Sequence, residues 1–260
     1  MNYIDTHCHL QHTMKKGAKL NDILEHAKKA GVIAIIDSPV FANDYSNAIR
    51  IHRSHPQLVF VTAGLSPANY HELDIDYALE RIRFFAENGE IVGIGEVGLD
   101  YYWVKDQKTR LKQHETFARF VALANELRLP LVIHSRDAEA EALPILAKRN
   151  EGVEVVMHSF GGTVETALQC IDSGYYISIP TCVTTRKKHR DYAKRVPLEQ
   201  LVIETDAPYL SPFPEDRTRN EPAYVRFAAK EIAKIKGLPE EDVARVTTEN
   251  AKKIFKLPLP

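Results

Sequence analysis

The chain has 260 residues, of which 44% are hydrophobic and 27% charged, and its formal net charge at pH 7 is −1. This balance is typical of an ordinary globular protein and excludes a wholly basic nucleic-acid-binding module, so any attraction for phosphate has to be local. No apolar run approaches the roughly 20 residues that cross a bilayer, and the N-terminus shows no secretory pattern, so we expect a cytoplasmic protein without a membrane partner.

Short apolar runs rich in β-branched residues recur along the whole chain. Near-continuous apolar runs, as opposed to strict alternation, are typical of parallel strands that are covered on both faces. The sequence predicts eight such strands, at 2–6, 32–37, 58–64, 91–98, 129–135, 153–159, 175–180 and 201–206.

Amphipathic segments with helical periodicity lie between these runs. They predict helices at 20–31, 75–89, 109–130, about 137–149, 163–172, 187–195 and 221–236. Strand and helix alternating eight times with short connections favour a (β/α)₈ TIM barrel that spans residues 1–260 as one domain, with closing helices at about 238–256. A doubly wound sheet fits less well, because no glycine-rich phosphate loop follows the first run.

Six ligand-type side chains stand where the predicted strands end. In a barrel the carboxyl ends of all strands meet on one face, where active sites are built. His7 and His9 are two residues apart, so along an extended chain both point inward while Cys8 between them points outward. The six residues are His7, His9, Glu96, His134, His158 and Asp206.

Four imidazoles and two carboxylates exceed the three or four protein ligands of a lone catalytic zinc. The excess predicts two divalent metal ions per subunit that share a carboxylate, and Glu96 on a central strand is the natural bridge. Asp206 can hold one metal and accept the proton of the attacking water, so we assign catalytic roles to Asp206 and Glu96. The ligand types suit Zn, Mn, Co or Fe better than Mg and do not identify the metal.

Five spaced motifs resemble a known family. They are DTHCHL (5–10), GIGEVGLDYY (93–102), LPLVIHSRDA (129–138), VVMHSFGG (155–162) and LVIETDAPYLSP (201–212), followed by RNEPAYV (219–225). Together they resemble the TatD family of metal-dependent deoxyribonucleases, a branch of the amidohydrolase-like barrels, from residue 3 to about 256. The resemblance implies a metal-dependent hydrolase that cleaves phosphodiester bonds of DNA from a 3′ end, with single-stranded DNA as the expected substrate.

The resemblance also implies how the ligands divide. His7, His9, Glu96 and Asp206 would hold one metal, and Glu96, His134 and His158 the other. The chain departs from the family at Ser66, where the family usually carries a histidine, and at Ser159 and Gly161 in the sixth-strand motif. The first departure bears on substrate and rate, because the missing histidine would lie near the metals.

Basic and aromatic residues at the predicted mouth are candidates for substrate binding. The loops at 184–190 and 215–220 are the most basic, and barrels often bind phosphate there. Arg136 could contact the scissile phosphate or pair with Asp137 or Asp100, and Tyr101 to Trp103 could stack on bases or pack over the rim. The basic candidates in the two loops are Arg186, Lys187, Lys188, Arg190, Arg217 and Arg219.

Two further assignments stay open at this point. Glu204 either orients a ligand histidine or forms a structural ion pair. His12, His26, His52, His55, His71, His114 and His189 do not end a predicted strand, and we interpret them as surface or capping residues.

Two other functions compete with the nuclease. The first is a metal-dependent ester hydrolase, for example on an aminoacyl ester of tRNA, because fold alone does not select the bond that is cleaved. The second is a metal-binding scaffold without turnover, which the complete ligand set with its base disfavours. We expect a monomer, with an oligomer left open.

Overall fold

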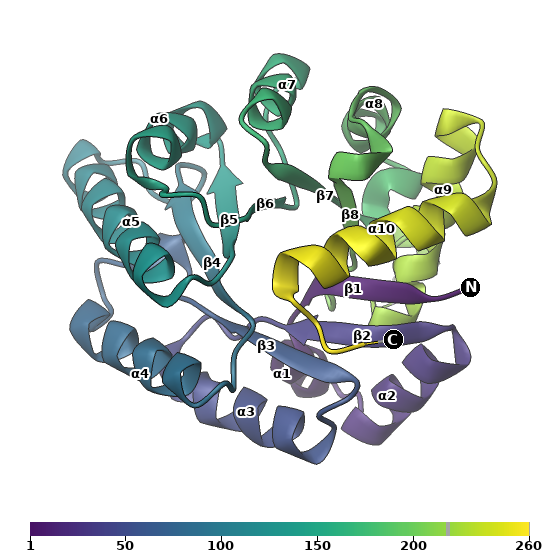
Figure 1. Cartoon of the computed structure of the whole chain (residues 1–260), viewed down its shortest axis with the longest axis horizontal. Helices are drawn as coiled ribbons and strands as arrows, with labels where there is room; N and C mark the ends of the chain where they lie inside the picture. Colours follow the sequence, from purple (N-terminus) through teal and green to yellow (C-terminus); the bar gives the residue numbers. More distant parts are fainter. Residues whose placement is uncertain (217–218, 260) are drawn as a thin grey trace.

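The computed structural model describes residues 1–216 and 219–259, and there it contains eight parallel strands that follow one another around the sheet in chain order. Figure 1 shows the strands surrounded by the helices that connect them, which confirms the predicted TIM barrel. The strands are β1 (Tyr3–Cys8), β2 (Val32–Asp37), β3 (Val59–Ala63), β4 (Gly93–Asp100), β5 (Leu131–Arg136), β6 (Val155–His158), β7 (Tyr176–Pro180) and β8 (Leu201–Glu204).

Most helices cover the outside of the barrel, and two lie at its ends. They are α1 (Leu10–Lys15), α2 (Leu20–Lys29), α3 (Tyr45–Ser54), α4 (Ile75–Glu87), α5 (Gln107–Leu127), α6 (Glu139–Arg149), α7 (Val164–Asp172), α8 (Lys187–Arg195), α9 (Val225–Lys236) and α10 (Glu240–Phe255). None of the described helices is both long and apolar enough to cross a membrane.

Most of the predicted elements lie within a few residues of the observed ones, and the differences have local causes. The sequence predictions missed α1, which has only six residues, and α3. Helix α9 begins at Val225 and not at 221, because Pro222–Tyr224 form a separate 3-10 turn. Strand β4 extends to Asp100, where it still pairs with Arg136 of β5.

Backbone hydrogen bonds close the ring between the first and last strands at the carboxyl end. The amide of Asp206 donates to the carbonyl of His7 at 2.9 Å, and the amide of His9 donates to the carbonyl of Ala207 at 2.8 Å. Because bonded backbone groups fix the chain on both sides, the loop after β8 is held against the residues that follow β1.

Two apolar layers stabilise the barrel. The larger one lies between the strands and the surrounding helices. The smaller one fills the opposite end from the site described below, where Ile254, Phe255 and Leu257 of the C-terminal segment meet inward-facing residues such as Ile4 and Ile36. Figure 1 shows α10 lying across the barrel at this end.

This second layer predicts a stability effect that is independent of the chemistry. Ile254 is 0% exposed, so Ile254→Ala should lower the free energy of unfolding by about 2–5 kcal/mol through lost burial and a residual cavity. Leu168→Ala, at a side chain that is 40% exposed on α7, should change it by less than about 0.5 kcal/mol. Urea unfolding followed by circular dichroism compares the two, and equal effects would contradict the role of α10 as the closing layer.

Candidate functional site

The six predicted ligand side chains converge around one carboxylate. Oε2 of Glu96 lies 3.2 Å from Nε2 of His7, 4.0 Å from Nε2 of His9 and 3.6 Å from Nε2 of His158. Oε1 lies 3.6 Å from Nδ1 of His134. Asp206 is connected to this group through His9, because Oδ1 of Asp206 lies 3.3 Å from Nε2 of His9. We call these six residues the ligand cluster.

Local backbone geometry places the members that do not lie inside strands. His9 is the first residue after β1 and forms the N-cap of α1, with φ −121°. Asp206 lies two residues beyond the end of β8 and has φ +54°, in the left-handed region that an aspartate rarely adopts. The sequence placed Asp206 in the strand; the positive φ ends the strand earlier and turns the carboxylate toward His9.

Close packing of β4 and β5 brings Glu96 and His134 together. Gly98 of β4 has φ +144°, and a Cβ at this position would lie 2.1 Å from the carbonyl oxygen of His134. Only glycine therefore permits this approach of the two strands. The glycine in the GEVGLD segment thus serves the geometry of the ligand cluster.

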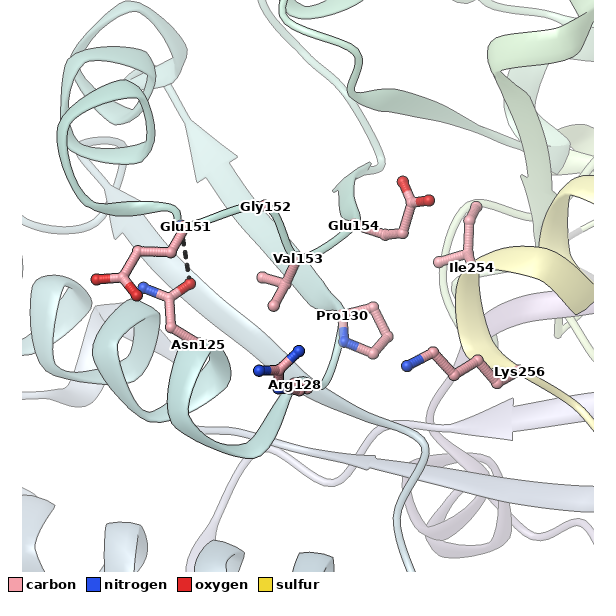
Figure 2. Close-up of a pocket in the computed structure, with 9 residues that line it drawn as sticks. All are labelled: Asn125, Arg128, Pro130, Glu151, Gly152, Val153, Glu154, Ile254 and Lys256. Atoms are coloured by element: carbon pink, nitrogen blue, oxygen red, sulfur yellow. Dashed lines mark hydrogen bonds between the residues drawn. The ribbon is translucent and has the colours of Figure 1, made fainter.

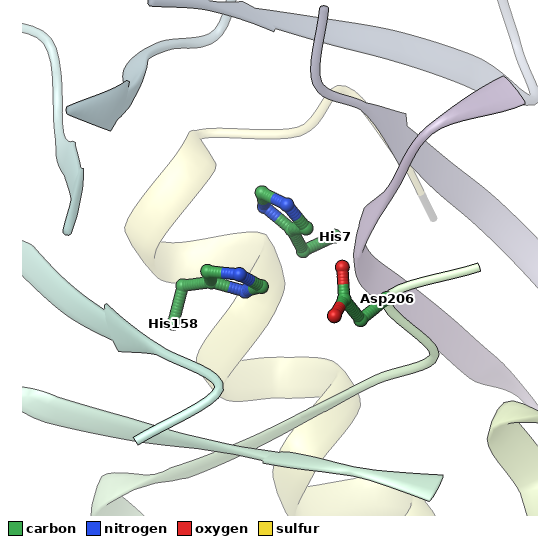
Figure 3. Close-up of side chains that lie close together, drawn as sticks. All are labelled: His7, His158 and Asp206. Atoms are coloured by element: carbon green, nitrogen blue, oxygen red, sulfur yellow. The ribbon is translucent and has the colours of Figure 1, made fainter. Parts of the chain in front are cut away.

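The rings of His7 and His158 stack at the centre of the ligand cluster. Their centroids are 3.6 Å apart with an interplanar angle of 25°. Figure 3 shows the two rings lying over one another with the Asp206 carboxylate beside them. Residues from β1, β6 and the loop after β8 therefore meet within the barrel.

Three of the four histidines have a second nitrogen that is held by a neighbouring acceptor. Nδ1 of His9 donates to the carbonyl of Ser38 at 2.7 Å, and Nε2 of His134 donates to Asp100 at 3.0 Å. Nδ1 of His158 donates to Glu204 at 3.0 Å, so the structure places Glu204 in contact with a histidine of the ligand cluster. Such contacts fix the ring orientation and leave the other nitrogen free to bind a metal.

The carboxylates and imidazoles shift one another's pKa values. Burial alone would raise the pKa of Glu96, but the neighbouring His134, His7 and His158 outweigh it and hold this pKa well below its ordinary value. Burial likewise opposes the charged form of His158, but Glu204 raises its pKa to about 10. For His7, burial and the nearby His158 lower the pKa to about 4, so this ring is neutral near pH 7.

The residues of the ligand cluster fit divalent cations. Both ring nitrogens of His7 are buried, and among the described residues neither makes a hydrogen bond of good geometry, although Nε2 lies 3.2 Å from Oε2 of Glu96. Three groups have ligand atoms within 4.8 Å of one another, namely His7, His9 and Glu96; Glu96, His134 and His158; and His7, His158 and Asp206. A metal would supply the missing partner of His7 and compensate the buried carboxylates.

The ligand cluster lies at the bottom of an open cavity of about 740 Å³. Arg136 and Trp103 lie on its wall near His134, and Ser66 and His12 lie on other parts of the wall. The Arg136 guanidinium stacks 3.7 Å from the centroid of the Tyr102 ring. The cavity is thus wider than the ligand cluster and offers a cation and an exposed indole to a bound molecule.

The other predicted substrate contacts lie elsewhere. The hydroxyl of Tyr101 bonds to His114 of α5, and among the described residues Tyr101 does not line the cavity. Arg186 is exposed at the start of α8, and Arg219 donates to the carbonyl of Lys16 at 3.0 Å. Of the other basic candidates, Lys188 bonds to the carbonyl of Gly161, Arg190 pairs with Glu231, Lys187 is exposed, and Arg217 lies outside the described residues.

Three residues of the site escaped the sequence analysis. Asp100 lies four residues after Glu96 on the same strand, and the two-residue period of a strand could have indicated it. Ser38 contributes only its carbonyl, so its side chain carries no signal. His12 was interpreted as a surface or capping residue, but it lines the cavity.

A second cavity, of about 370 Å³, lies at the other end of β5 and β6. Figure 2 shows Arg128, Pro130 and Lys256 on one side of it, and the amide of Glu151 bonded to Asn125 at 3.0 Å on the other. Among the residues that line it there is no histidine. Among the described residues, the three groups of side chains that could hold a metal all belong to the ligand cluster and not to this cavity.

Comparisons with known proteins match nearly the whole chain. The model of the family described as TatD related DNase matches residues 4–256. The chain is 36% identical to "Uncharacterized metal-dependent hydrolase YabD" of Bacillus subtilis over 97% of this chain and 98% of that protein. It is 31% identical to human "Deoxyribonuclease TATDN3", with 97% and 94% covered. The solved structure of the TatD homolog YjjV from Escherichia coli has a TM-score of 0.87 and 25% identity over 98% of both chains.

The contact between Glu204 and His158 predicts an effect on metal affinity. Glu204→Gln should weaken binding of Mn²⁺ or Zn²⁺ by about 10–100-fold, because the ring of His158 loses the charged acceptor that orients it. Isothermal titration calorimetry of metal-stripped protein measures this. Glu199→Gln, at an exposed position just before β8, is the matched control. Equal affinities in both variants would show that Glu204 does not position His158 for a metal.

Proposed function

The chain belongs to the TatD-related DNase family, and from that premise we propose that it is a two-metal phosphodiesterase that removes nucleotides from single-stranded DNA. Membership confirms the resemblance drawn from the motifs and makes the protein a metal-dependent hydrolase. The observation that carries the finer proposal is the position of Glu96, with four imidazoles within 4.0 Å of its carboxylate.

The two oxygens of Glu96 support a bridging role. Oε1 faces His134, whereas Oε2 faces His7, His9 and His158. In this proposal His7, His9, Glu96 and Asp206 would hold one metal, and Glu96, His134 and His158 would hold the other. His158 lies near both groups, since it also has ligand atoms close to His7 and Asp206. When bound, two divalent cations lower the pKa of the attacking water and stabilise charge on the entering and leaving oxygens.

Asp206 is the proposed proton acceptor. Its side chain is 14% exposed and lines the cavity, so a water there can reach it. Burial opposes ionisation, but the hydrogen bond from His9 and the charge of His158 hold the pKa of Asp206 below its ordinary value. The carboxylate is therefore ionised and takes the proton of the water as oxygen bonds to phosphorus. The bond from phosphorus to the leaving nucleotide oxygen then breaks, and that oxygen takes a proton from solvent.

Arg136 is the proposed contact for the scissile phosphate. It follows His134 by two residues and lines the same cavity. Stacking on Tyr102 holds the planar guanidinium in place while its N–H groups stay available to a phosphate. Trp103, which is 66% exposed at the same wall, offers a surface on which a base can stack.

One observation favours a second candidate function. Ser66 lines the cavity at the position where the family usually carries a histidine. A site that lacks this imidazole suits a less demanding leaving group, such as the ribose oxygen of an aminoacyl ester. The alternative is therefore an ester hydrolase on a phosphate-rich substrate such as aminoacyl-tRNA.

The nuclease proposal predicts nucleotide release from single-stranded DNA that Mn²⁺ or Mg²⁺ stimulates and EDTA stops. Asp206→Ala should lower kcat by at least about 10²-fold, because the proton acceptor is lost. Gel analysis of a labelled oligonucleotide measures the rate, and circular dichroism with metal analysis verifies that the variant is folded and loaded. Asp172→Ala, an exposed position at the end of α7, is the matched control.

Other outcomes decide between the alternatives. Full activity of the Asp206→Ala variant would remove the assigned proton acceptor. Cleavage of aminoacyl-tRNA with a matched DNA oligomer left intact would select the ester hydrolase. Bound metals without turnover of either substrate would favour a scaffold.

A further inference from the structure

Helix α1 presents an imidazole to the cavity that the proposed mechanism does not use. His12 is half-buried, lines the cavity, and has its ring centroid 5.1 Å from that of His9. Its Nδ1 lies 3.3 Å from the hydroxyl of Tyr209, which lines the same wall. His12 is thus held beside the ligand cluster without belonging to any of the groups that could bind a metal.

A cation lies over the ring of the tyrosine that His12 contacts. Lys16 follows His12 by four residues, which is one helical turn, and its Nζ lies 4.7 Å from the centroid of the Tyr209 ring. Arg219 donates to the backbone carbonyl of Lys16 at 3.0 Å and so ties the end of α1 to the loop after β8. His12, Lys16 and Tyr209 therefore form one supported surface, which we call the α1 surface.

The α1 surface lies across the mouth from Arg136. Helix α1 follows β1 and Arg136 ends β5, and these strands are four positions apart in a ring of eight. The ligand cluster occupies the space between them, with His9 next to His12 and His134 two residues before Arg136. A polymeric substrate whose scissile group lies at Glu96 would meet Arg136 on one side and the α1 surface on the other.

We propose that His12, Lys16 and Tyr209 form a subsite for a phosphate group that neighbours the scissile phosphate, on the opposite side of the ligand cluster from Arg136. This inference rests on the proposed function, because it takes the scissile phosphate to lie at the ligand cluster. It deepens that function, since the preferred substrate becomes an oligonucleotide with a further phosphate next to the cleaved bond and not a single diester.

The chemistry of the three side chains suits a phosphate oxygen. A tyrosine hydroxyl is protonated at neutral pH, and when it donates to Nδ1 of His12 the proton of the neutral imidazole lies on Nε2. Nε2 can then donate to a phosphate oxygen. Lys16 adds a mobile positive charge, which attracts a phosphate without fixing its angle of approach.

Binding and turnover are measured on the same samples to test this. The binding probe is a fluorescently labelled thymidine pentamer with phosphorothioate linkages, which keep their charge and resist hydrolysis, titrated by anisotropy against Mn²⁺-loaded protein. Turnover is measured on bis(4-nitrophenyl) phosphate, which has no neighbouring phosphate, and on an unmodified pentamer. The variants are His12→Leu, His12→Gln and Lys16→Gln, with Lys19→Gln as a control for the loss of one exposed charge near α1.

The subsite predicts a specific pattern. His12→Leu should raise the Kd of the probe about tenfold, as expected for a lost hydrogen bond to a charged group. His12→Gln should stay within about threefold of the original Kd, because an amide keeps a donor and an acceptor. Lys16→Gln should reduce the slope of log Kd against log salt by about 0.7, and Lys19→Gln should leave it unchanged. In His12→Leu, turnover of the pentamer should fall more than turnover of the small diester.

Two results would overturn the subsite. One is unchanged binding of the probe in both His12→Leu and Lys16→Gln. The other is an equal loss of turnover on the pentamer and on the small diester in His12→Leu. Failure of the proposed function has a different signature. If the metal-loaded protein hydrolysed neither the small diester nor the unmodified pentamer, the nuclease would be excluded, and the binding measurements would still decide the role of the α1 surface.

Discussion

A carboxylate buried among four imidazoles is the constraint on which the rest of the site depends. Glu96 is only 6% exposed, and a buried charge without compensation is costly. The negative charge of Glu96 can be compensated by protons on the neighbouring imidazole rings or by metal cations. In both cases the four rings have to lie close to the carboxylate. The strands that carry the rings, the acceptors behind them and the close approach at Gly98 all serve to hold this arrangement.

The barrel divides its tasks between two ends. At one end, the C-terminal helix and the inward-facing apolar residues close the core, and none of the ligand cluster lies there. At the other end, polar side chains occupy positions that apolar residues would otherwise fill, and each buried one needs a partner. Stability therefore comes chiefly from one end and from the outer layer, which leaves the loops at the mouth free to carry chemistry.

The sequence was informative wherever a residue's role follows from strand periodicity. Eight apolar runs predicted the barrel, and the placement of ligand-type residues after those runs predicted that His7, Glu96 and His158 would meet. The sequence was less informative where a turn of the backbone decides the position of a side chain. Asp206 depends on a left-handed backbone conformation, His12 depends on a six-residue helix that has no clear pattern, and the ring of Tyr101 turns toward α5 just after its strand ends.

The bonds that join β1 to the loop after β8 have a consequence for how the protein is made. His7 and His9 leave the ribosome before Asp206, which is synthesised about two hundred residues later. Domains generally fold as units during synthesis, so these two imidazoles remain without Asp206 until the strands that lie between them in the sequence have been made. Capture of a metal by the complete set of ligands therefore belongs to the last stage of folding, after the ring of strands has closed.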